Sequence, residues 1–462
     1  MRSDGIVERI RQKMASRGIH PQAIESFLQM VLQVDDEQSA YVPLDQVSTP
    51  NSALLLKAPD PSDLAKLAAR GKSLLKNVAV IKLNGGRSTT MGGLTPKGVL
   101  TAKNGRSYLE IIVAQVEAVR SQWDVQIPLV LMNSFFTHGP TMEILRRFDL
   151  PVLTFMQSEV PRLFEGSLAP LESDSDEDWA PAGHGDVYES LQRSGLLDKL
   201  RQRGCKWVLI SNLDNLAACV EPWILGLIES EGIEFLLEVT ARTKVDRKGG
   251  TLVVRNGQLD LLEIAQVAPQ DRESFMDINR FRVFNTNNVW VDLDALAEAL
   301  KEGPMRLPLI QNHKTVFGHK VIQLETAMGA AIGSFRHARG LQVDRNRFFP
   351  TKKVADLFLL QSDVCILDSM YKLQKNPLRP SSLPLRPTVS FGSEFLSSPF
   401  ELCRRFEDPS SVSLVNACTF DVSGSVFFER DIRIEGKVAI DAPPEGVYRI
   451  PRGTVLRDGT YP

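Results

Sequence analysis

The sequence predicts an α/β protein in which a mainly parallel, mixed sheet carries helices on both faces, followed by a short parallel β-helix. Two patterns predict this. Short apolar runs alternate with amphipathic helical stretches from residue 76 onward, which is typical of βαβ crossovers and a parallel sheet. From residue 414 onward, apolar residues recur at every sixth position, which is typical of β-helix rungs that each turn one side chain inward.

The first segment, residues 1–75, is expected to be a helical extension. Apolar residues fall four apart at Ile6, Ile10 and Met14, and residues 61–76 resemble another helix that leads into the first strand. Such apolar stripes are usually packing surfaces. We therefore expect no chemistry from this extension.

The predicted sheet domain spans residues 76–375. Its first strand, Val78 to Leu83, ends in a glycine-rich loop, and Asn256-Gly257 later predicts a tight hairpin. Between them the expected helices are 108–120, 141–148, 187–200 and 221–231, and the expected strands are 127–132, 152–156 and 207–211.

Ligands of such sheets bind at the carboxyl ends of the strands. The loops that carry Gly85, Gln157, His184 and Asn212 are expected to meet there.

The C-terminal unit, residues 411–462, follows a predicted linker at 376–410 that begins with a stretch rich in Pro and Ser. So few rungs provide little core of their own, so we expect this unit to pack on the sheet domain or on another subunit. The residues at the six-residue spacing are Leu414, Phe420, Val426, Ile432, Val438, Ile450 and Leu456.

Composition argues for a globular protein without general affinity for polyanions. The 462 residues are 43% hydrophobic and 24% charged, with a net charge of −2, so neither nucleic acid nor an acidic membrane is an expected partner. The five cysteines are scattered and form no CxxC pair, which favours a reducing compartment. Without an apolar leader or a long apolar run, the expected location is cytoplasmic, with no membrane span.

The loop after the first strand is the first candidate site. It contains Gly85, Gly86, Gly92 and Gly93 and ends at Lys97. Glycines let phosphate oxygens approach backbone N–H groups closely, and the lysine adds a positive charge, which predicts a nucleoside triphosphate site. Glycine-rich turns after strands are also common without any ligand, and neither GxGxxG nor GxxxxGK[ST] is present.

Asp214 lies among amide side chains directly after the strand that ends near Ser211. A carboxylate at this position suits Mg²⁺, which takes one or two protein oxygens together with phosphate oxygens. Asp214 could equally cap the next helix.

His184, between Gly183 and Gly185, could donate to a sugar hydroxyl or a phosphate, although a lone histidine is more often structural. The acidic run before it, from Glu172 to Asp178, is expected to be a solvated loop.

Two further clusters are polar. Glu263 and the amides of residues 285–288 match the donors and acceptors of a sugar ring. The cations Arg345, Arg347, Lys352 and Lys353 form either a solvated face or a group that stabilises an anionic leaving group.

Taken together and in this order, these segments resemble the eukaryotic-type UTP–glucose-1-phosphate uridylyltransferase (UDP-glucose pyrophosphorylase) family over roughly residues 40 to 460. The motifs that carry the resemblance are LNGG…TTMG…PK at 83–97, FMQSEVPRL at 155–163, GHGDVYESLQRSGLLD at 183–198, ISNLDN at 210–215, EVTARTKVDRKGGTL at 238–252, LLEIAQV at 261–267, FNTNNVWVDL at 284–293, QLETAMGAAI at 323–332 and NRFFPTKKVADLFLLQSD at 346–363.

The resemblance implies a nucleotidyltransferase (Rossmann-like) domain and a left-handed β-helix, with UTP and glucose 1-phosphate as substrates and Mg²⁺ as cofactor. It implies Lys352 and Lys97 as catalytic residues on the phosphates. It further implies a nucleotide loop of Leu83, Asn84, Gly85 and Gly86, uracil contacts at Gln157 and Gly183, a metal site at Asp214, and a sugar phosphate site of His184, Asn212, Glu263, Asn285 and Asn287.

One segment departs from the family. The usual Gly-Gly-Leu-Gly-Thr-Ser-Met-Gly reads Gly-Gly-Arg-Ser-Thr-Thr-Met-Gly here, with Arg87 and Ser88. Ser88 would be strained where a glycine turns with positive φ, and Arg87 could add a phosphate contact or alter nucleotide preference. Another sugar 1-phosphate, or nucleotide-sugar binding without catalysis, therefore remains an alternative, and homo-oligomers through the β-helix are possible.

Overall fold

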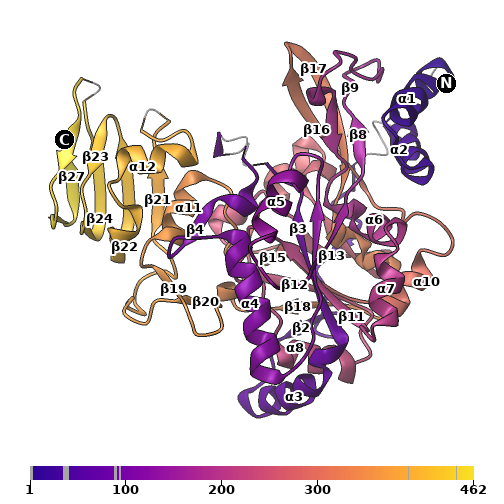
Figure 1. The fold of residues 1–462 in the computed structure, drawn as a ribbon, viewed down its shortest axis with the longest axis horizontal. Helices are drawn as coiled ribbons and strands as arrows, with labels where there is room; N and C mark the ends of the chain where they lie inside the picture. Colours follow the sequence, from indigo (N-terminus) through magenta and orange to yellow (C-terminus); the bar gives the residue numbers. More distant parts are fainter. Residues whose placement is uncertain (1–3, 35–40, 88–90, 93–94, 394, 444) are drawn as a thin grey trace.

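The computed structural model describes residues 4–34, 41–87, 91–92, 95–393, 395–443 and 445–462. A central sheet lies between two flanks (Figure 1). Helices α1 (Asp4–Ser16) and α2 (Pro21–Gln33) lie at one end of the molecule, and the C-terminal strands lie at the opposite end. The helices expected in the first segment are therefore present, while a separate helical extension over residues 1–75 stays a prediction.

The central sheet has eight strands, and all neighbours are parallel except β15, which runs antiparallel to both β11 and β12. This confirms the mainly parallel, mixed sheet. In spatial order the strands are β2 (Leu55–Lys57), β18 (Ala338–Gln342), β12 (Phe235–Ala241), β15 (Val283–Asp292), β11 (Trp207–Asn212), β3 (Val78–Asn84), β6 (Leu129–Asn133) and β7 (Val152–Met156).

Helices cover both faces of this sheet, because successive side chains of a strand point to opposite faces. In β3, Val78 and Val80 join one core, while Ala79 and Ile81 join the other. The first core is covered by α3 (Pro61–Leu74), α4 (Tyr108–Trp123), α8 (Pro222–Ser230) and α11 (Val354–Gln361); the second is covered by α6 (Val187–Arg193), α7 (Leu196–Gln202) and α10 (Leu293–Ala299).

The single helix expected at 187–200 is wrong. The structure has two helices, α6 and α7, divided at Gly195, whose φ of 70° lies in the left-handed region that ends a helix.

The Asn256-Gly257 hairpin is confirmed. It joins β13 (Thr251–Arg255) to β14 (Gln258–Leu262), with φ of 52° and 79° at the two turn residues. The remaining elements are α5 (His138–Leu145), α9 (Arg272–Phe275), β1 (Val47–Ser48), β4 (Thr101–Lys103), β5 (Arg106–Ser107), β8 (Glu159–Pro161), β9 (Leu163–Phe164), β10 (Trp179–Pro181), β16 (Leu309–Val316), β17 (His319–Thr326), β19 (Cys365–Leu367) and β20 (Leu373–Lys375).

The C-terminal unit consists of short parallel strands. Its apolar residues at the six-residue spacing are all buried, with Leu414 and Phe420 fully inside. Phe420 lies opposite Val438 in the parallel register. The left-handed winding stays a prediction. The strands of this unit are β22 (Ser413–Ser423), β23 (Val426–Phe428), β24 (Arg433–Asp441), β25 (Tyr448–Ile450), β26 (Val455–Leu456) and β27 (Gly459–Tyr461). The segment predicted as a linker contains β21 (Thr388–Phe391), which pairs in parallel with β22, and α12 (Leu402–Arg405).

This unit packs on the sheet domain, as expected. Phe358 of α11 lies with its ring centroid 4.7 Å from that of Phe406 and 6.1 Å from that of Phe420. One apolar core therefore runs from the sheet into the C-terminal strands. The exact domain limits remain predictions. Among the described residues, no helix has the length and apolar character needed to cross a membrane.

Candidate functional site

Three parallel strands end together at the edge of the sheet where the site is expected. Leu83 of β3 pairs with Asn212 of β11, and Asn84 pairs with Asn133 of β6. The buried carboxamide of Asn84 donates to Asn133 Oδ1 at 2.8 Å and to Thr141 Oγ1 at 2.7 Å. The side chain of Asn84 therefore fixes the base of the nucleotide loop.

Gly85 brings this loop against Gln157. A Cβ atom at Gly85 would lie only 1.7 Å from Gln157 Nε2, so no other residue fits there without displacing that amide. Ser134 Oγ donates to the Gly85 carbonyl at 2.8 Å, while Gly86 has open space beside it. The predicted strain at Ser88 concerns a residue outside the described ranges.

Asp214 and Lys97 form the centre of the candidate site. Lys97 Nζ donates to Asp214 Oδ2 at 2.7 Å and to the Thr351 carbonyl at 2.8 Å. Asp214 Oδ1 is buried and has no hydrogen-bond partner within the described chain. The next helix, α8, has Glu221 at its N-cap, so the alternative role of Asp214 as a helix cap is wrong.

A divalent cation fits this environment. Leaving a carboxylate oxygen buried and unpaired is costly, and a cation would satisfy it. In the part of the chain that the structure describes, no cluster of three metal-binding side chains exists. A single carboxylate that acts together with substrate phosphates is the arrangement that Mg²⁺ accepts more readily than metals that need a full protein cage.

Asn215 ties Asp214 to residues 345–353, the lysine segment that contains Lys352 and Lys353. Asn215 was not assigned to the site in the sequence analysis. Its Nδ2 donates to the Arg347 carbonyl at 3.1 Å, and its Oδ1 accepts from Phe349 N at 2.9 Å. The side chain is fully buried. Its position beside Asp214 was visible in the sequence, but its partners lie more than a hundred residues away.

Lys352 lies at the end of that segment, just before α11. The backbone N–H groups of Lys352 and Lys353 both donate to Asp356 Oδ2, at 2.9 and 2.8 Å. The segment is thus fixed at the helix N-terminus while the Lys352 side chain is exposed.

Charged side chains are buried beneath the site. Arg347 donates to both oxygens of Glu238, at 2.6 and 2.9 Å, and Trp290 Nε1 donates to the same carboxylate at 2.9 Å. Arg345 donates to Asp246 at 2.9 Å. The expected cluster of four cations is therefore divided, because both arginines serve ion pairs of the fold.

His184 lies on the opposite side of the candidate site. Its Nδ1 accepts from Met328 N at 3.0 Å, and burial, followed by the charge of Lys352, lowers its pKa to about 4. The ring is neutral at pH 7 with its proton on Nε2, which makes that nitrogen a hydrogen-bond donor.

Glu263 and two asparagines complete this side. Burial raises the pKa of Glu263 to about 7, although the charge of Lys352 and a hydrogen bond from Asn285 oppose the rise. Asn285 Nδ2 donates to Asn287 Oδ1, and Asn285 Oδ1 accepts from Asn287 N, both at 2.9 Å. Lys352 thus influences both His184 and Glu263, which joins the lysine segment to this polar group.

Gly183 and Asn212 lie at the same edge. Gly183 has φ of 88°, and a Cβ atom there would meet Glu325 Cβ at 2.9 Å, so glycine is required. Asn212 is half-buried at the end of β11, and its carbonyl accepts from Asn215 N at 3.2 Å.

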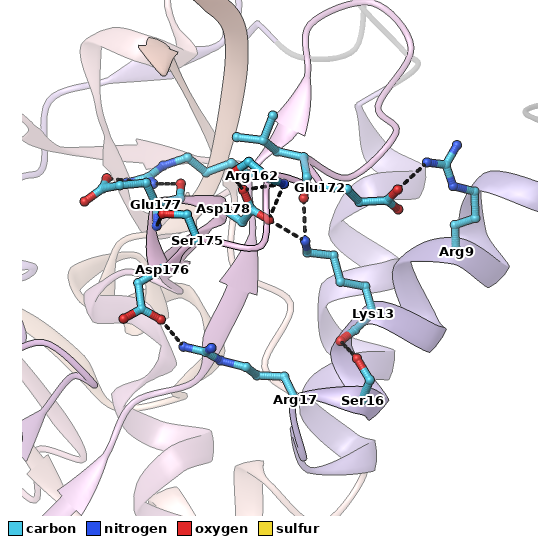
Figure 2. A network of polar contacts seen from close by, with 12 residues as sticks. Arg9, Lys13, Ser16, Arg17, Arg162, Glu172, Ser175, Asp176, Glu177 and Asp178 are labelled. Carbon is cyan, nitrogen blue, oxygen red and sulfur yellow. Dashed lines mark hydrogen bonds and ion pairs between the residues drawn. The ribbon is translucent and has the colours of Figure 1, made fainter. Parts of the chain in front are cut away.

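The acidic run was expected to be a solvated loop, and this holds for part of it, since Glu172, Asp174 and Asp176 are exposed whereas Asp178 is buried. Asp178 is 1% exposed and accepts from Lys13 Nζ at 2.8 Å. Figure 2 shows two further pairs with the run, one from Arg9 of α1 to Glu172 and one from Arg17, which directly follows α1, to Asp176. The run is a docking segment for the N-terminal helix.

The comparisons with known proteins agree with this architecture. The family model described as UTP–glucose-1-phosphate uridylyltransferase matches residues 24–435. The enzyme of that name from Pyrus pyrifolia is 38% identical over 464 residues, covering 98% of this chain and 96% of the relative.

Two solved structures also match. A UDP-glucose phosphorylase from Trypanosoma brucei superimposes with a TM-score of 0.88 at 32% identity, and covers 99% of both chains. A mutant UDP-glucose pyrophosphorylase from Leishmania major in complex with UDP-glucose has a TM-score of 0.85 at 31% identity, with the same coverage. On the extent of these matches, the chain belongs to the UTP–glucose-1-phosphate uridylyltransferase family.

Proposed function

We propose that this protein transfers the uridylyl group of UTP to glucose 1-phosphate, giving UDP-glucose and pyrophosphate. The observation that carries the proposal is the Lys97–Asp214 pair, which leaves one buried carboxylate oxygen without a hydrogen-bond partner at the edge of the sheet. Asn215 ties the segment of Lys352 to this edge. Family membership supplies the substrates, since relatives across nearly the whole length carry this activity in their names.

The nucleotide is proposed to lie along the loop after β3. Leu83, Asn84, Gly85 and Gly86 form the loop, and Lys97 binds the phosphates at its far end. Gln157 and the backbone of Gly183 take the uracil. The contact between Gly85 and Gln157 supports this order, because it places a carboxamide with both a donor and an acceptor beside the loop.

Glucose 1-phosphate is proposed to bind on the opposite side. His184, Asn212, Glu263, Asn285 and Asn287 would contact it. A neutral His184 donates from Nε2 and the carboxamides offer donors and acceptors, which suits hydroxyl groups. The phosphate would then face Lys352, the cation that influences both His184 and Glu263.

The reaction requires two anions to approach each other. The phosphate oxygen of glucose 1-phosphate attacks the α-phosphorus of UTP in line, and pyrophosphate leaves. Mg²⁺ at Asp214 would neutralise phosphate charge when bound. Lys97 and Lys352 hold the two phosphates against their mutual repulsion. Asn215 keeps the segment of Asp214 in register with the segment of Lys352. The reaction is expected to be reversible, because one phosphoanhydride replaces another.

The proposal includes three narrower expectations. The C-terminal strands are expected to wind as a left-handed β-helix, and the six-residue spacing and the buried apolar positions support a β-helix. The protein is expected in the cytoplasm, and homo-oligomers could form through the C-terminal unit.

The test is a pyrophosphate-release assay with UTP, Mg²⁺ and a panel of sugar 1-phosphates. We expect release with glucose 1-phosphate to exceed release with N-acetylglucosamine, galactose and pentose 1-phosphates. Preference for another sugar would overturn the substrate assignment. Nucleotide binding without any release of pyrophosphate would overturn the activity itself.

A further inference from the structure

The acidic segment between α1 and the nucleotide loop, residues 172–178, has two sides. Glu172 and Asp178 are bound by Arg9 and Lys13 of α1, and Asp176 is bound by Arg17, which directly follows that helix (Figure 2). Glu177 is different, because its partners are Arg162 and Arg87. One carboxylate of the segment therefore contacts the nucleotide loop.

Arg87 belongs to that loop and is one of the two residues, with Ser88, at which the loop differs from the usual family sequence. Its backbone forms an antiparallel bridge with Pro96, next to Lys97. Its guanidinium lies 3.2 Å from Glu177 Oε1 and 3.1 Å from the ring centroid of Phe136. Arg87 is thus placed at the Lys97 end of the loop, where the phosphates are proposed to bind.

The charges at this contact do not balance. Arg162 NH1 also lies 3.4 Å from Glu177 Oε2, so two guanidinium groups share one carboxylate. Burial lowers the pKa of Arg162, and the charge of Arg87 lowers it further. The Glu177 side chain is 42% exposed, so the carboxylate can exchange for another anion at little desolvation cost.

We infer that Arg87 is a phosphate-binding residue of this enzyme and that Glu177 occupies its guanidinium until the triphosphate arrives. The inference rests on the proposed function. Arg87 then contacts the β- and γ-phosphates, since Lys97, Asp214 and Lys352 already surround the α-phosphate. Helix α1 acts as a positioning element through the pair of Lys13 with the buried Asp178, which is the residue next to Glu177.

The inference predicts opposite effects for the two partners. Arg87→Leu, which introduces the residue usual in the family, removes a charged hydrogen-bond donor and should raise KM for UTP about tenfold. Glu177→Gln removes the competing carboxylate and should lower KM for UTP about twofold to fivefold. In the double variant, Glu177→Gln should have no effect, because it acts only through Arg87.

The reverse reaction separates this role from a structural one. KM for pyrophosphate should rise with Arg87→Leu, while KM for UDP-glucose should change less than about twofold, because UDP-glucose lacks the departing diphosphate. Asp176→Asn is the matched control, since it removes the same charge from the same segment but on the side that faces Arg17. Asp176→Asn should leave the KM values for UTP, pyrophosphate and UDP-glucose unchanged.

The possible outcomes are distinct. If Asp176→Asn lowers KM for UTP as much as Glu177→Gln does, the effect is general electrostatics and the inference is wrong. It is equally wrong if Arg87→Leu raises KM for UDP-glucose and pyrophosphate alike, which would indicate a distorted loop. If the unaltered protein releases no pyrophosphate from any sugar phosphate, the proposed function fails first.

Discussion

The two flanks of the central sheet both end at the candidate site, yet they are attached by different forces. Toward the nucleotide loop, the N-terminal flank is attached by ion pairs of α1, including Lys13 with Asp178 at 2.8 Å. The C-terminal flank is attached by stacked phenylalanines, with Phe406 lying 4.7 Å from both Phe358 and Phe428. Behind β10 the N-terminal helices have an apolar cluster as well, but the segment that reaches the loop is charged.

The C-terminal flank therefore holds a proposed catalytic residue in a fixed position, whereas the N-terminal flank can adjust. The exposed pairs of Arg9 with Glu172 and of Arg17 with Asp176 contribute little and weaken with salt, whereas buried aromatic contacts are large and insensitive to salt. The rigid attachment leads through α11 to Lys352, a proposed catalytic residue. The adjustable attachment leads through Glu177 to Arg87, a residue that must exchange partners.

The C-terminal flank should be essential for turnover through Lys352. Lys352→Ala is expected to lower kcat about 10²- to 10³-fold, because a cation that stabilises developing phosphate charge is lost. KM for UTP should change only severalfold, and the free energy of unfolding should not change, since the side chain is exposed. Lys353→Ala, at the adjacent exposed lysine, is the control and should retain nearly full turnover. Unaltered kcat in Lys352→Ala would reject the catalytic assignment.

The aromatic cluster should dominate the stability of the same flank. Phe406→Ala is expected to lower the free energy of unfolding by about 3–5 kcal/mol, because it leaves a cavity among Phe358, Phe420 and Phe428. Urea titration at low and high salt measures the loss, which should be the same in both. The control is Phe400→Ala, whose side chain is 58% exposed and should cost less than about 0.5 kcal/mol. Equal losses for the two variants would contradict this difference between the flanks.

The N-terminal flank should show a smaller loss that depends on pH. Bonds from Lys13 and Ser173 outweigh the effect of burial and lower the pKa of Asp178. The contribution of Asp178 is therefore complete above its unfolded pKa near 4 and disappears as the pH falls through the lower folded value. Asp178→Asn should cost about 1–3 kcal/mol at pH 7, because the buried partners lose a charged acceptor.

Urea titrations across the acidic range measure this difference. The gap between Asp178→Asn and the unaltered protein should narrow as the pH falls below about 4. Asp176→Asn, whose side chain is 65% exposed, should show almost no gap at any pH. A gap for Asp178→Asn that does not vary with pH would mean that packing, and not the ion pair, holds this segment.

Local periodicity predicted most of the fold. The alternation of apolar and helical stretches was sufficient for the strands of the parallel sheet, and the spacing of six identified the buried positions of the C-terminal unit. The break at Gly195 was missed because apolar residues continue on both sides of Ser194 and Gly195, so the pattern resembles one helix. A single glycine costs a helix too little to mark its end without the neighbouring packing.

The candidate site was predicted in part. Residues at strand ends, such as Asp214, follow from the fold because parallel strands end at one edge. Contacts over long sequence distances do not follow, as the pairs of Asn215 with Phe349 and of Glu238 with Arg347 illustrate. The burial of Asp178 within the acidic run was missed for the same reason, since its cationic partner, Lys13, lies in the first helix.

The contact of Phe358 with the C-terminal strands bears on how this protein can be shortened or recombined. A version that stops at residue 376 would keep the whole central sheet, yet it would leave one side of α11 in water immediately after Lys352. Such a fragment should aggregate and have a low turnover number, and so should not serve as a minimal enzyme. Chimeras that borrow the last strands from a relative should therefore borrow α11 with them.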